Sequence, residues 1–523
     1  MIKRVFIFVA FALVAISVLA QDITLLFDND VHCAIDGYAK VAALRRETPK
    51  EFTVMISAGD FLNGEAVGSF DEGKTIIDIM NVVKYDIVVP GNHEFDYGID
   101  VLNARLGKLD AKALCLNFMK GEKRLLNAST VREYNGRRIA FIGVTTPSVI
   151  QSSTPVFFMD SAKQFIYDFG GFKVADMLQE KVNDLRREGV DYIVLISHIG
   201  LDSDQFGIST QLLLMLTSGI DIVIDGHSHD DIITSFPNKN NEDVLVMQTG
   251  TKMKNIGRLI IKEDGTLQPE LIEVAKLKNI DQATKEIIDN AKKDLQKQLS
   301  RKIGTSRVTL MAVDAAGNHI IKYSETNLGD FVADAICRVA KADCGFINSG
   351  SLRCNLDNGT ITYGQWNACS PFNNNVMVAE CTGAQLLDIL ECSVAMLPYN
   401  SGSLQQISGI EMTVDAKVKS PVVYDIHGFV NRIKGTRKVV SAKVWNKETG
   451  RYEKIDPNKT YKIATTDYAL VNMGCENMFK DCKLTSEKPI GTLSEVIETY
   501  IKKNLNGTIG EEYRKSQNRI KIL

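Results

Sequence analysis

The sequence predicts an α/β protein of two domains, and three observations support this prediction. The chain has 523 residues, more than a single hydrophobic core normally organises. Its first half alternates short apolar runs with segments of helical periodicity, which is the pattern of an α/β domain. After Ile260 this alternation gives way to a charged segment and then to a second series of apolar segments.

The N-terminal segment has the composition of a secretory signal peptide. Lys3 and Arg4 precede an uncharged apolar run from Val5 to Leu19, and Ala20 and Gln21 follow. A membrane anchor is the alternative, but the run is shorter than the roughly 20 apolar residues that a membrane-spanning helix needs. We therefore expect residues 1–20 to be cleaved, the mature chain to have no membrane span, and the protein to be periplasmic or extracellular.

Seven short runs in residues 21–275 predict buried strands. Each run is mostly apolar and β-branched and is bounded by polar or glycine residues. The runs are Ile23–Phe27, Thr53–Ser57, Asp86–Val89, Ile139–Val144, Tyr192–Ser197, Asp221–Ile224 and Val244–Gln248. Between two of them, Gly171–Arg187 carries apolar residues on one helical face. Strands that alternate with helices predict the first α/β domain.

A charged segment of helical periodicity, residues 276–302, follows this domain. Apolar residues recur in it at helical spacing, and Asp281 stands where a helix N-cap is expected. A solvent-exposed helix and a linker helix between domains are compatible interpretations. Residues 303–523 are then expected to form the second α/β domain, with helices near Leu328–Lys341 and Gly383–Met396.

The composition excludes some classes of protein and leaves the state of the cysteines open. A formal net charge of −3 argues against a nucleic-acid polymer as partner, because phosphate backbones require a basic face. Eight of the ten cysteines lie after residue 330 and none forms a CxxC pair, which disfavours a zinc knuckle. Disulfide bonds in the second half and buried free thiols are equally good interpretations.

Metal-competent side chains follow five of the predicted strands. The carboxyl ends of parallel strands share one edge of a sheet, where α/β proteins bind ligands. Each motif is weak alone, but five strand ends that deliver such side chains to one edge predict a metal site. Its candidate ligands are Asp30, His32, Asp60, Asn92, His198, His227 and His229. His93 and Asp96, which follow the third predicted strand, belong to the same site.

The kinds of side chain indicate which metals and which chemistry to expect. Imidazole and carboxylate together favour Zn, Mn, Fe or Co over Ca or Mg. The set is too large for one tetrahedral metal, so we expect two divalent metal ions about 3.5–4 Å apart, bridged by one carboxylate. Such a pair lowers the pKa of a water molecule and stabilises an in-line displacement at phosphorus.

This ordered set of motifs resembles the calcineurin-like metallophosphoesterases, and the whole mature chain resembles the 5′-nucleotidase family. The resemblance implies an N-terminal β-sandwich flanked by helices (αββα), a linker helix, and a second α/β domain that binds substrate. It implies Zn, Mn or Co ions bound by two sets of ligands that share one bridging aspartate. These sets are Asp30, His32, Asp60 and His229 for one metal, and Asp60, Asn92, His198 and His227 for the other. It also implies that His93, oriented by Asp96, stabilises the phosphoryl group.

The second domain matches the family's substrate motifs in part. Asn348-Ser349-Gly350-Ser351-Leu352-Arg353 is similar to the family's N-G-G-G-I-R, and Pro371-Phe372-Asn373-Asn374 to its P-F-x-N. Lys322 stands where the family has an arginine, and Gly474-Cys475-Glu476 departs from G-G-D. The resemblance implies phosphate contacts from the cations, base stacking by the aromatics, and further substrate contacts. The corresponding residues are Lys322, Asn348, Arg353, Phe372, Tyr468 and Glu476.

The expected function is hydrolysis of nucleoside 5′-monophosphates, with nucleotide sugars as further substrates. One alternative is a different hydrolase of the superfamily, such as a 2′,3′-cyclic-nucleotide phosphodiesterase with 3′-nucleotidase activity or a thiosulfate-ester hydrolase. Another is a non-catalytic nucleotide-binding surface protein, which requires the loss of a metal ligand. No ligand of the motif set is missing from the sequence.

Overall fold

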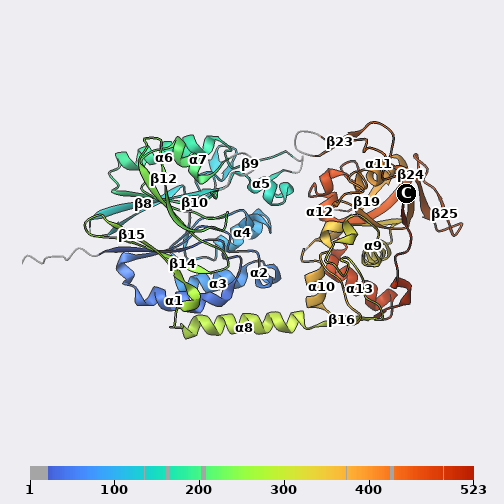
Figure 1. Ribbon diagram of the computed structural model, residues 1–523, viewed down its shortest axis with the longest axis horizontal. Helices are drawn as coiled ribbons and strands as arrows, with labels where there is room; N and C mark the ends of the chain where they lie inside the picture. The colour runs from blue at the N-terminus through green and yellow to red at the C-terminus, as the bar shows by residue number, and fades with distance from the viewer. Residues whose placement is uncertain are drawn as a thin grey trace, which may run out of the picture.

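The computed structural model describes residues 22–523 apart from 135, 161–163, 202–207, 373, 425–428 and 487. The predicted signal peptide lies outside the described residues. Figure 1 shows two domains joined along one side by the long helix α8 (Gln282–Leu299). Within the described part of the chain, none of the helices combines the length and the apolar character needed to cross a bilayer.

The N-terminal domain contains two six-stranded sheets, each with a parallel centre. The first has the order β15-β14-β1-β2-β3-β4, and the second has the order β12-β13-β11-β10-β8-β7. The first is formed by β1 (Ile23–Asp28), β2 (Thr53–Ser57), β3 (Ile87–Val88), β4 (Lys112–Ala113), β14 (Asn255–Ile261) and β15 (Leu267–Glu273). The second is formed by β7 (Ser129–Tyr134), β8 (Arg137–Thr145), β10 (Tyr192–His198), β11 (Ile222–Ile224), β12 (Asp231–Pro237) and β13 (Asp243–Thr249). Five of the seven predicted runs lie within these strands, and the other two, Asp86–Val89 and Asp221–Ile224, extend slightly beyond β3 and β11.

The strands are hydrophobic on both faces because an apolar core lies between the two sheets and helices cover the outer faces. Leu25 and Phe27 of β1 pack there with Phe141 of β8 and Ile196 of β10, and all four are fully buried. Helices cover both outer faces: α1 (Tyr38–Glu47) and α3 (Lys74–Val83) on one side, and α6 (Lys173–Arg187) and α7 (Thr210–Leu216) on the other (Figure 1). The predicted αββα sandwich is therefore confirmed.

Shorter elements complete this domain and lie mostly in the connections between strands and helices. The helices are α2 (Ala66–Asp71), α4 (Ile99–Leu106) and α5 (Val149–Ser152), and the strands of a small third sheet are β5 (Met119–Lys120), β6 (Lys123–Arg124) and β9 (Tyr167–Asp168). Four aromatic rings pack together beneath these connections: Phe95, Phe118, Phe158 and Phe169. This aromatic cluster supports the segment that follows β3, which carries several of the predicted site residues.

Helix α8 lies within residues 276–302 and contacts both domains. Its N-cap is Asp281, whose carboxylate accepts a hydrogen bond from Thr284 N at 2.9 Å and pairs with Arg46 of α1. Ile288 of α8 is buried against the first domain, where α8 packs on α1, α2 and α3. Toward its other end α8 contacts α10 (Tyr363–Cys369) of the second domain.

The second domain is also mixed α/β, as predicted. Its central sheet has the order β20-β17-β26-β19-β27, with β28 beside β19, and α9 (Asn327–Val339), α11 (Gly383–Ser393) and α13 (Leu493–Thr499) pack around it. These strands are β17 (Cys344–Asn348), β19 (Asn375–Thr382), β20 (Gln405–Ser408), β26 (Thr460–Thr466), β27 (Lys483–Leu484) and β28 (Gly491–Thr492). The predicted helices 328–341 and 383–396 correspond to α9 and α11.

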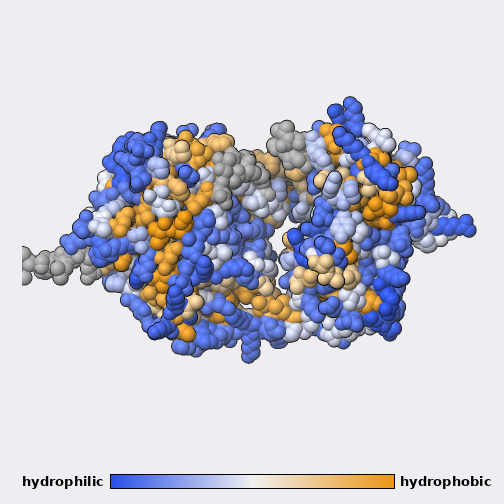
Figure 2. Space-filling view, viewed as in Figure 1, coloured by the Kyte–Doolittle hydropathy of each residue, from blue (hydrophilic) through white to orange (hydrophobic). Residues whose placement is uncertain are grey.

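Three smaller sheets and one short helix surround the central sheet of this domain. The first sheet contains β16 (Lys302–Ser306), β18 (Gly359–Thr362) and β29 (Thr508–Ile509), and the second contains β21 (Ile410–Val414), β24 (Val439–Asn446), β25 (Arg451–Lys454) and β30 (Ile520–Ile522). The third contains β22 (Val422–Tyr424) and β23 (Val430–Ile433). The short helix α12 (Asp467–Leu470) follows β26. Figure 2 shows an opening between the two domains, bounded on one side by α8. The loops that carry the predicted site residues belong to both domains.

Candidate active site

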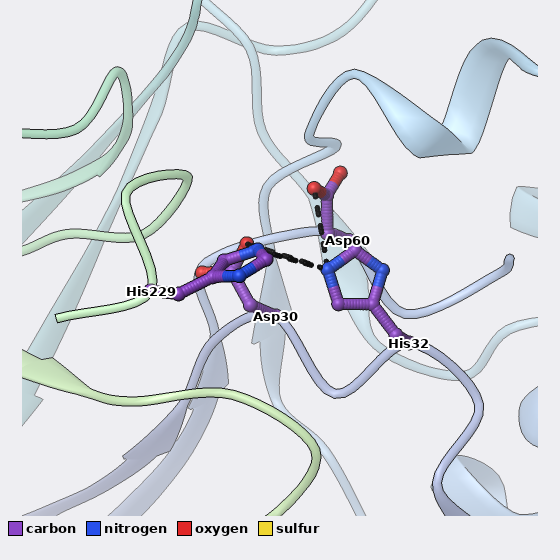
Figure 3. Close-up of side chains that lie close together, drawn as sticks. All are labelled: Asp30, His32, Asp60 and His229. Atoms are coloured by element: carbon purple, nitrogen blue, oxygen red, sulfur yellow. Dashed lines mark hydrogen bonds and ion pairs between the residues drawn. The ribbon is translucent and has the colours of Figure 1, made fainter. Parts of the chain in front are cut away.

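The predicted metal-site residues all follow strands of the two N-terminal sheets. Asp30 and His32 follow β1, Asp60 follows β2, and Asn92 follows β3, while His198 ends β10 and His227 and His229 follow β11. Figure 3 shows four of these side chains directed toward one another: Asp30 and His32 from the loop after β1, Asp60 from the loop after β2, and His229 from the loop after β11. Convergence of the strand ends therefore brings together residues that are up to 199 positions apart in the chain.

The backbone at this site is strained where it presents the ligands. Positive φ angles occur at Asp30 (51°), His32 (50°), Asp60 (57°), His227 (78°) and His229 (60°), although none of these residues is glycine. A left-handed conformation costs a non-glycine residue on the order of 1 kcal/mol or more. Five such residues in one site show that the surrounding fold determines where these side chains point.

The side chains form two groups of potential metal ligands that share Asp60. Within each group the ligand atoms lie within 4.8 Å of one another. The first group is Asp30, His32, Asp60 and His229, and the second is Asp60, His198 and His227. Both groups agree with the ligand sets that the family resemblance implies.

Distances within the first group fit a shared metal ion. His32 Nε2 and His229 Nε2 are 3.1 Å apart. Two nitrogen ligands bound at about 2.0–2.1 Å to one ion are about 2.9–3.4 Å apart at octahedral or tetrahedral angles. Asp30 Oδ1 is 3.3 Å from His229 Nε2. Asp30 Oδ1 is 3.8 Å from His32 Nε2, so two of the three distances lie in this range and the third is somewhat longer.

The hydrogen bonds around the site leave one acceptor or one ring nitrogen of each ligand free to bind a metal. Asp30 Oδ2 accepts hydrogen bonds from His227 N at 2.9 Å and Asn29 Nδ2 at 2.7 Å, so Oδ1 faces the centre. The Nδ1 atom of His198 lies 2.6 Å from Ala58 O, which leaves Nε2 for the metal.

Asn92 provides the observation that tests the fit of a metal most directly. Its Oδ1 atom is buried and has no hydrogen-bond partner among the described residues. A buried carbonyl oxygen without a partner costs about 1–3 kcal/mol, so such atoms normally have a ligand. An amide oxygen, carboxylates and imidazoles together suit a divalent ion such as Zn, Mn or Co. The residues present therefore fit two divalent metals.

Glu94 is a residue of this site to which the sequence analysis assigned no role. Its buried carboxylate accepts hydrogen bonds from four backbone N–H groups: Gly91 at 2.6 Å, Asp60 at 2.7 Å, Phe61 at 2.7 Å and Leu62 at 2.8 Å. Burial, together with the negative charge of Asp60, raises the pKa of Glu94 to about 7. Glu94 thus joins the loop after β2 to the loop after β3.

His93 and Asp96 form a hydrogen-bonded pair beside the metal ligands. His93 Nδ1 lies 2.6 Å from Asp96 Oδ2, and Asn63 Nδ2 donates to the same oxygen at 2.7 Å. Burial lowers the pKa of His93, but the hydrogen bond to Asp96 and the charge of Asp60 outweigh this and raise the pKa to about 9. The His93 side chain is 38% exposed, so its other nitrogen is accessible.

In the second domain the structure brings Arg353 and Phe372 together. The Arg353 guanidinium lies over the Phe372 ring at 5.2 Å from its centroid. Phe372 is 40% exposed and Tyr468 is 39% exposed, so part of each ring is accessible to a ligand. Lys322 ends a short 3₁₀ helix (Ile320–Lys322). Exposed rings next to cations suit a ligand with an aromatic part and an anionic part.

Two further predicted substrate residues have partners inside the domain. Asn348 Oδ1 accepts a hydrogen bond from Ser351 Oγ at 2.6 Å, and its Nδ2 donates to Gly402 O at 3.2 Å. Glu476 Oε1 accepts from Ser403 Oγ at 2.8 Å. Among the described residues, no hydrogen bond or ion pair joins any predicted substrate residue to the metal ligands. The metal centre and the substrate residues are therefore separate in this conformation.

The segment that departs from G-G-D keeps a glycine-like backbone. Met473, Cys475, Glu476 and Asn477 all have positive φ, between 50° and 60°. Gly474 packs against Tyr468, and a Cβ atom on it would lie 2.5 Å from that ring. Left-handed backbone at four positions and close packing of Gly474 on Tyr468 therefore define the shape of this loop.

Comparison with known families agrees with this geometry. Residues 23–231 match the family described as calcineurin-like phosphoesterase, and residues 302–481 match the family described as 5′-nucleotidase, C-terminal domain. The chain combines these two domains. The first match contains every predicted metal ligand, and the second contains every predicted substrate residue.

The chain is similar to curated proteins over most of its length. It is 26% identical over 498 residues to the trifunctional nucleotide phosphoesterase protein YfkN of Bacillus subtilis, covering 86% of this chain but 32% of that protein. The chain thus spans about a third of that relative. It is 27% identical to the 5′-nucleotidase of Vibrio cholerae, covering 71% of this chain and 73% of that protein.

The fold is also found in a solved structure. A putative 5′-nucleotidase from Staphylococcus aureus superposes with a TM-score of 0.64 at 20% identity, covering 96% of this chain and 100% of that one. Since this match includes both domains, it supports the two-domain fold.

Gly91 tests the geometry of the metal centre in this phosphoesterase domain. A Cβ atom at this position would lie 2.2 Å from Asp60 Oδ1 and 2.6 Å from His198 Nε2. We expect Gly91→Ala to displace both ligands and to weaken metal binding on the order of 100-fold. Metal content by elemental analysis after equilibrium dialysis measures this.

Gly402→Ala is the matched control, because its Cβ atom would be 3.6 Å from the nearest atom and lies in the other domain. It should bind metal like the unmodified chain. Two ions bound with unchanged affinity by a folded Gly91→Ala chain would show that these side chains are not the ligands.

Proposed function

We propose that this protein is an exported two-metal phosphohydrolase that releases phosphate from nucleoside 5′-monophosphates. The observation that carries the proposal is the pair of ligand groups sharing Asp60, with the His93–Asp96 pair beside them. The relatives named 5′-nucleotidase and the matching C-terminal domain support a nucleotide as substrate. The basic and apolar pattern of residues 1–20 supports export to the periplasm or the cell exterior.

The two groups of ligands would hold two divalent ions such as Zn, Mn or Co. When bound, these ions supply a water of lowered pKa and positive charge next to the phosphoryl oxygens. The chain's own contribution is the geometry: Asp60 belongs to both groups, and the N–H groups that bind Glu94 fix the loop from which Asp60 projects. A fixed arrangement of ligands avoids reorganisation during the reaction.

His93 is placed to donate a hydrogen bond to a phosphoryl oxygen. Its Nδ1 is held by Asp96, so the ring is oriented with Nε2 away from that carboxylate. The backbone N–H of His93 donates to Asp60 Oδ1 at 2.9 Å, which ties the position of the ring to the metal ligand. A donor held in this way stabilises charge that develops on the phosphoryl group.

The second domain supplies binding for the rest of the nucleotide. Arg353 and Lys322 carry the positive charge for the phosphate, with Lys322 acting as a point charge rather than a bidentate partner. Phe372 and Tyr468 present ring faces on which a base can stack, and stacking tolerates different bases. Because these residues and the metal ligands lie in different domains, we propose that relative domain motion brings the phosphate to the metals.

A second candidate is a broader nucleotide phosphoesterase that also accepts nucleotide sugars or cyclic nucleotides. The similarity to a relative named trifunctional nucleotide phosphoesterase favours it. The Glu476 side chain, which replaces the family's aspartate, also gives this chain a different contact near the sugar position.

A substrate panel with metal removal tests the proposal. We expect phosphate release from AMP to stop after chelation and to return on addition of Zn, Mn or Co, because the reaction needs the metals that the ligand groups hold. UDP-glucose and 2′,3′-cyclic AMP separate the first candidate from the second when their products are resolved by chromatography, because the first hydrolysis of either yields a phosphomonoester and no free phosphate. Activity on AMP that survives complete chelation contradicts the proposed mechanism.

His93→Ala tests the role of the histidine. We expect kcat for AMP to fall by about 10²–10⁴-fold, since one donor to the developing charge is lost. Two bound metals per chain should remain, because His93 is in neither ligand group. A smaller loss is expected for Asp96→Asn, which keeps a polar partner. Turnover near that of the unmodified chain, with both metals present, rules out the role.

Phe372→Ala and Tyr468→Ala test base stacking. Each should raise KM for AMP by about 10-fold or more, because a stacking surface is lost. KM for ribose 5-phosphate, which has no base, should change little. Trp445→Ala removes a ring of similar exposure, 41%, elsewhere in the same domain, and should leave both substrates unaffected. Equal effects on AMP and ribose 5-phosphate would argue against stacking.

A further inference from the structure

Two pairs of cysteines in the second domain lie side by side. All ten cysteines of the chain carry free thiols in the structure. Cys354 lies in a loop next to Cys369, the last residue of α10, and Cys381 of β19 lies near Cys482, which directly precedes β27. Disulfide bonds require two Cα atoms about 4.4–6.8 Å apart with side chains directed toward each other. Strand register indicates such an approach for one pair, and backbone contacts indicate it for the other.

Strand register places Cys381 opposite Cys482. In the antiparallel pair of β19 and β27, Ala379 faces Leu484 and Glu380 faces Lys483. The next step in this register pairs Cys381 with Cys482, so both side chains leave the sheet on the same face.

The type of pairing at this position favours a short distance. Thr485 N donates to Val378 O at 3.0 Å, which makes that pair a hydrogen-bonded one. Hydrogen-bonded and non-hydrogen-bonded pairs alternate, so Cys381 and Cys482 form a non-hydrogen-bonded pair with Cα atoms about 4.5 Å apart. Consistently, Cys482 N donates to Phe479 O at 3.0 Å rather than to the neighbouring strand. This separation lies within the range for a disulfide.

Backbone contacts hold Cys354 and Cys369 together. Arg353 N donates to Cys369 O at 2.7 Å, and the Cys369 thiol donates to Cys354 O at 3.2 Å. The adjacent Cys369 thiol lowers the pKa of Cys354 to about 7, while contact with Cys354 and burial raise the pKa of Cys369. Cys354 is half-buried and accessible, and Cys369 is buried. An accessible thiolate with a second thiol in contact is the arrangement from which disulfides form.

We propose that Cys354–Cys369 and Cys381–Cys482 form disulfide bonds when the chain meets an oxidant of the disulfide class. In each case one cysteine thiolate attacks a sulfur of the oxidant, forms a mixed disulfide and releases one thiol. The second cysteine, after losing its proton, attacks the sulfur of the first and releases the other thiol. Two protein thiols lose two electrons and two protons, and one oxidant disulfide becomes two thiols.

The Cys354–Cys369 bond would fix the relation between two proposed substrate residues. Cys354 directly follows Arg353, and Cys369 ends α10 just before the loop with Phe372. The guanidinium and the ring already lie in contact at 5.2 Å. A covalent link at the base of both loops keeps this pair preformed, which favours binding of a nucleotide. This consequence rests on the proposed function, whereas the two bonds themselves do not.

Peptide mapping of the full purified chain tests the bonds directly. The chain is treated with oxidised glutathione or with dithiothreitol, alkylated in denaturant, and digested without reduction. We expect two cross-linked peptides, one for each pair, and alkylation of the other six cysteines after oxidation. Alkylation of all ten cysteines in the oxidised sample, or links between other cysteines, overturns the proposal.

Paired variants assign each bond and separate it from the proposed function. Cys354→Ser/Cys369→Ser should remove only the first cross-linked peptide, and Cys381→Ser/Cys482→Ser only the second.

The oxidised chain should unfold on the order of 5–10 °C above the reduced chain for the Cys354–Cys369 bond alone. KM for AMP should rise several-fold on reduction in the Cys381→Ser/Cys482→Ser variant but not in the other. Bonds that form without any change in KM leave the pairing intact and contradict only the consequence for substrate binding.

Discussion

The buried carboxylate of Glu94 is the interaction on which the metal centre depends. It accepts hydrogen bonds from one N–H group after β3 and from three consecutive N–H groups after β2. These two loops carry Asn92 and Asp60, and Asp60 belongs to both ligand groups. Without the carboxylate, four buried N–H groups would lose their partners, at a cost of about 1–3 kcal/mol each. The two loops would then lose the hydrogen bonds that stabilise their strained backbone.

The same constraint explains why the site is rigid although its parts are far apart in the chain. Gly59 and Gly91 pass so close to each other and to His198 that no side chain fits there. Five ligands adopt positive φ, and hydrogen bonds with backbone groups hold the carboxylate of Asp30 and the ring of His198. The free energy for this arrangement comes from the apolar core between the sheets, where the strands that precede the ligands are fully buried.

Much of the first domain could be predicted, because its central strands are buried on both faces and read as continuous apolar runs. The strands β14 and β15 were not predicted: in β15 polar and apolar residues alternate and the strand forms an edge, so no apolar run marks it. The metal ligands could be predicted because strand ends converge, whereas Glu94 could not, since a buried carboxylate looks like a surface residue in sequence. The Cys381–Cys482 pair depends on the register of β19 and β27, which joins segments about 100 residues apart. Roles of the substrate residues and the domain boundaries stay predictions.

Helix α8 has a mechanical consequence. It rests on the first domain through Ile288 and its N-cap, and its far end contacts α10, from which the loop with Phe372 continues. An 18-residue helix is about 27 Å long. As a lever arm pivoting near Asp281, it would shift its far end by about 5 Å for a tilt of about 10°. A small adjustment of side-chain packing at one end is thereby amplified into a displacement comparable to the size of a phosphate group at the other.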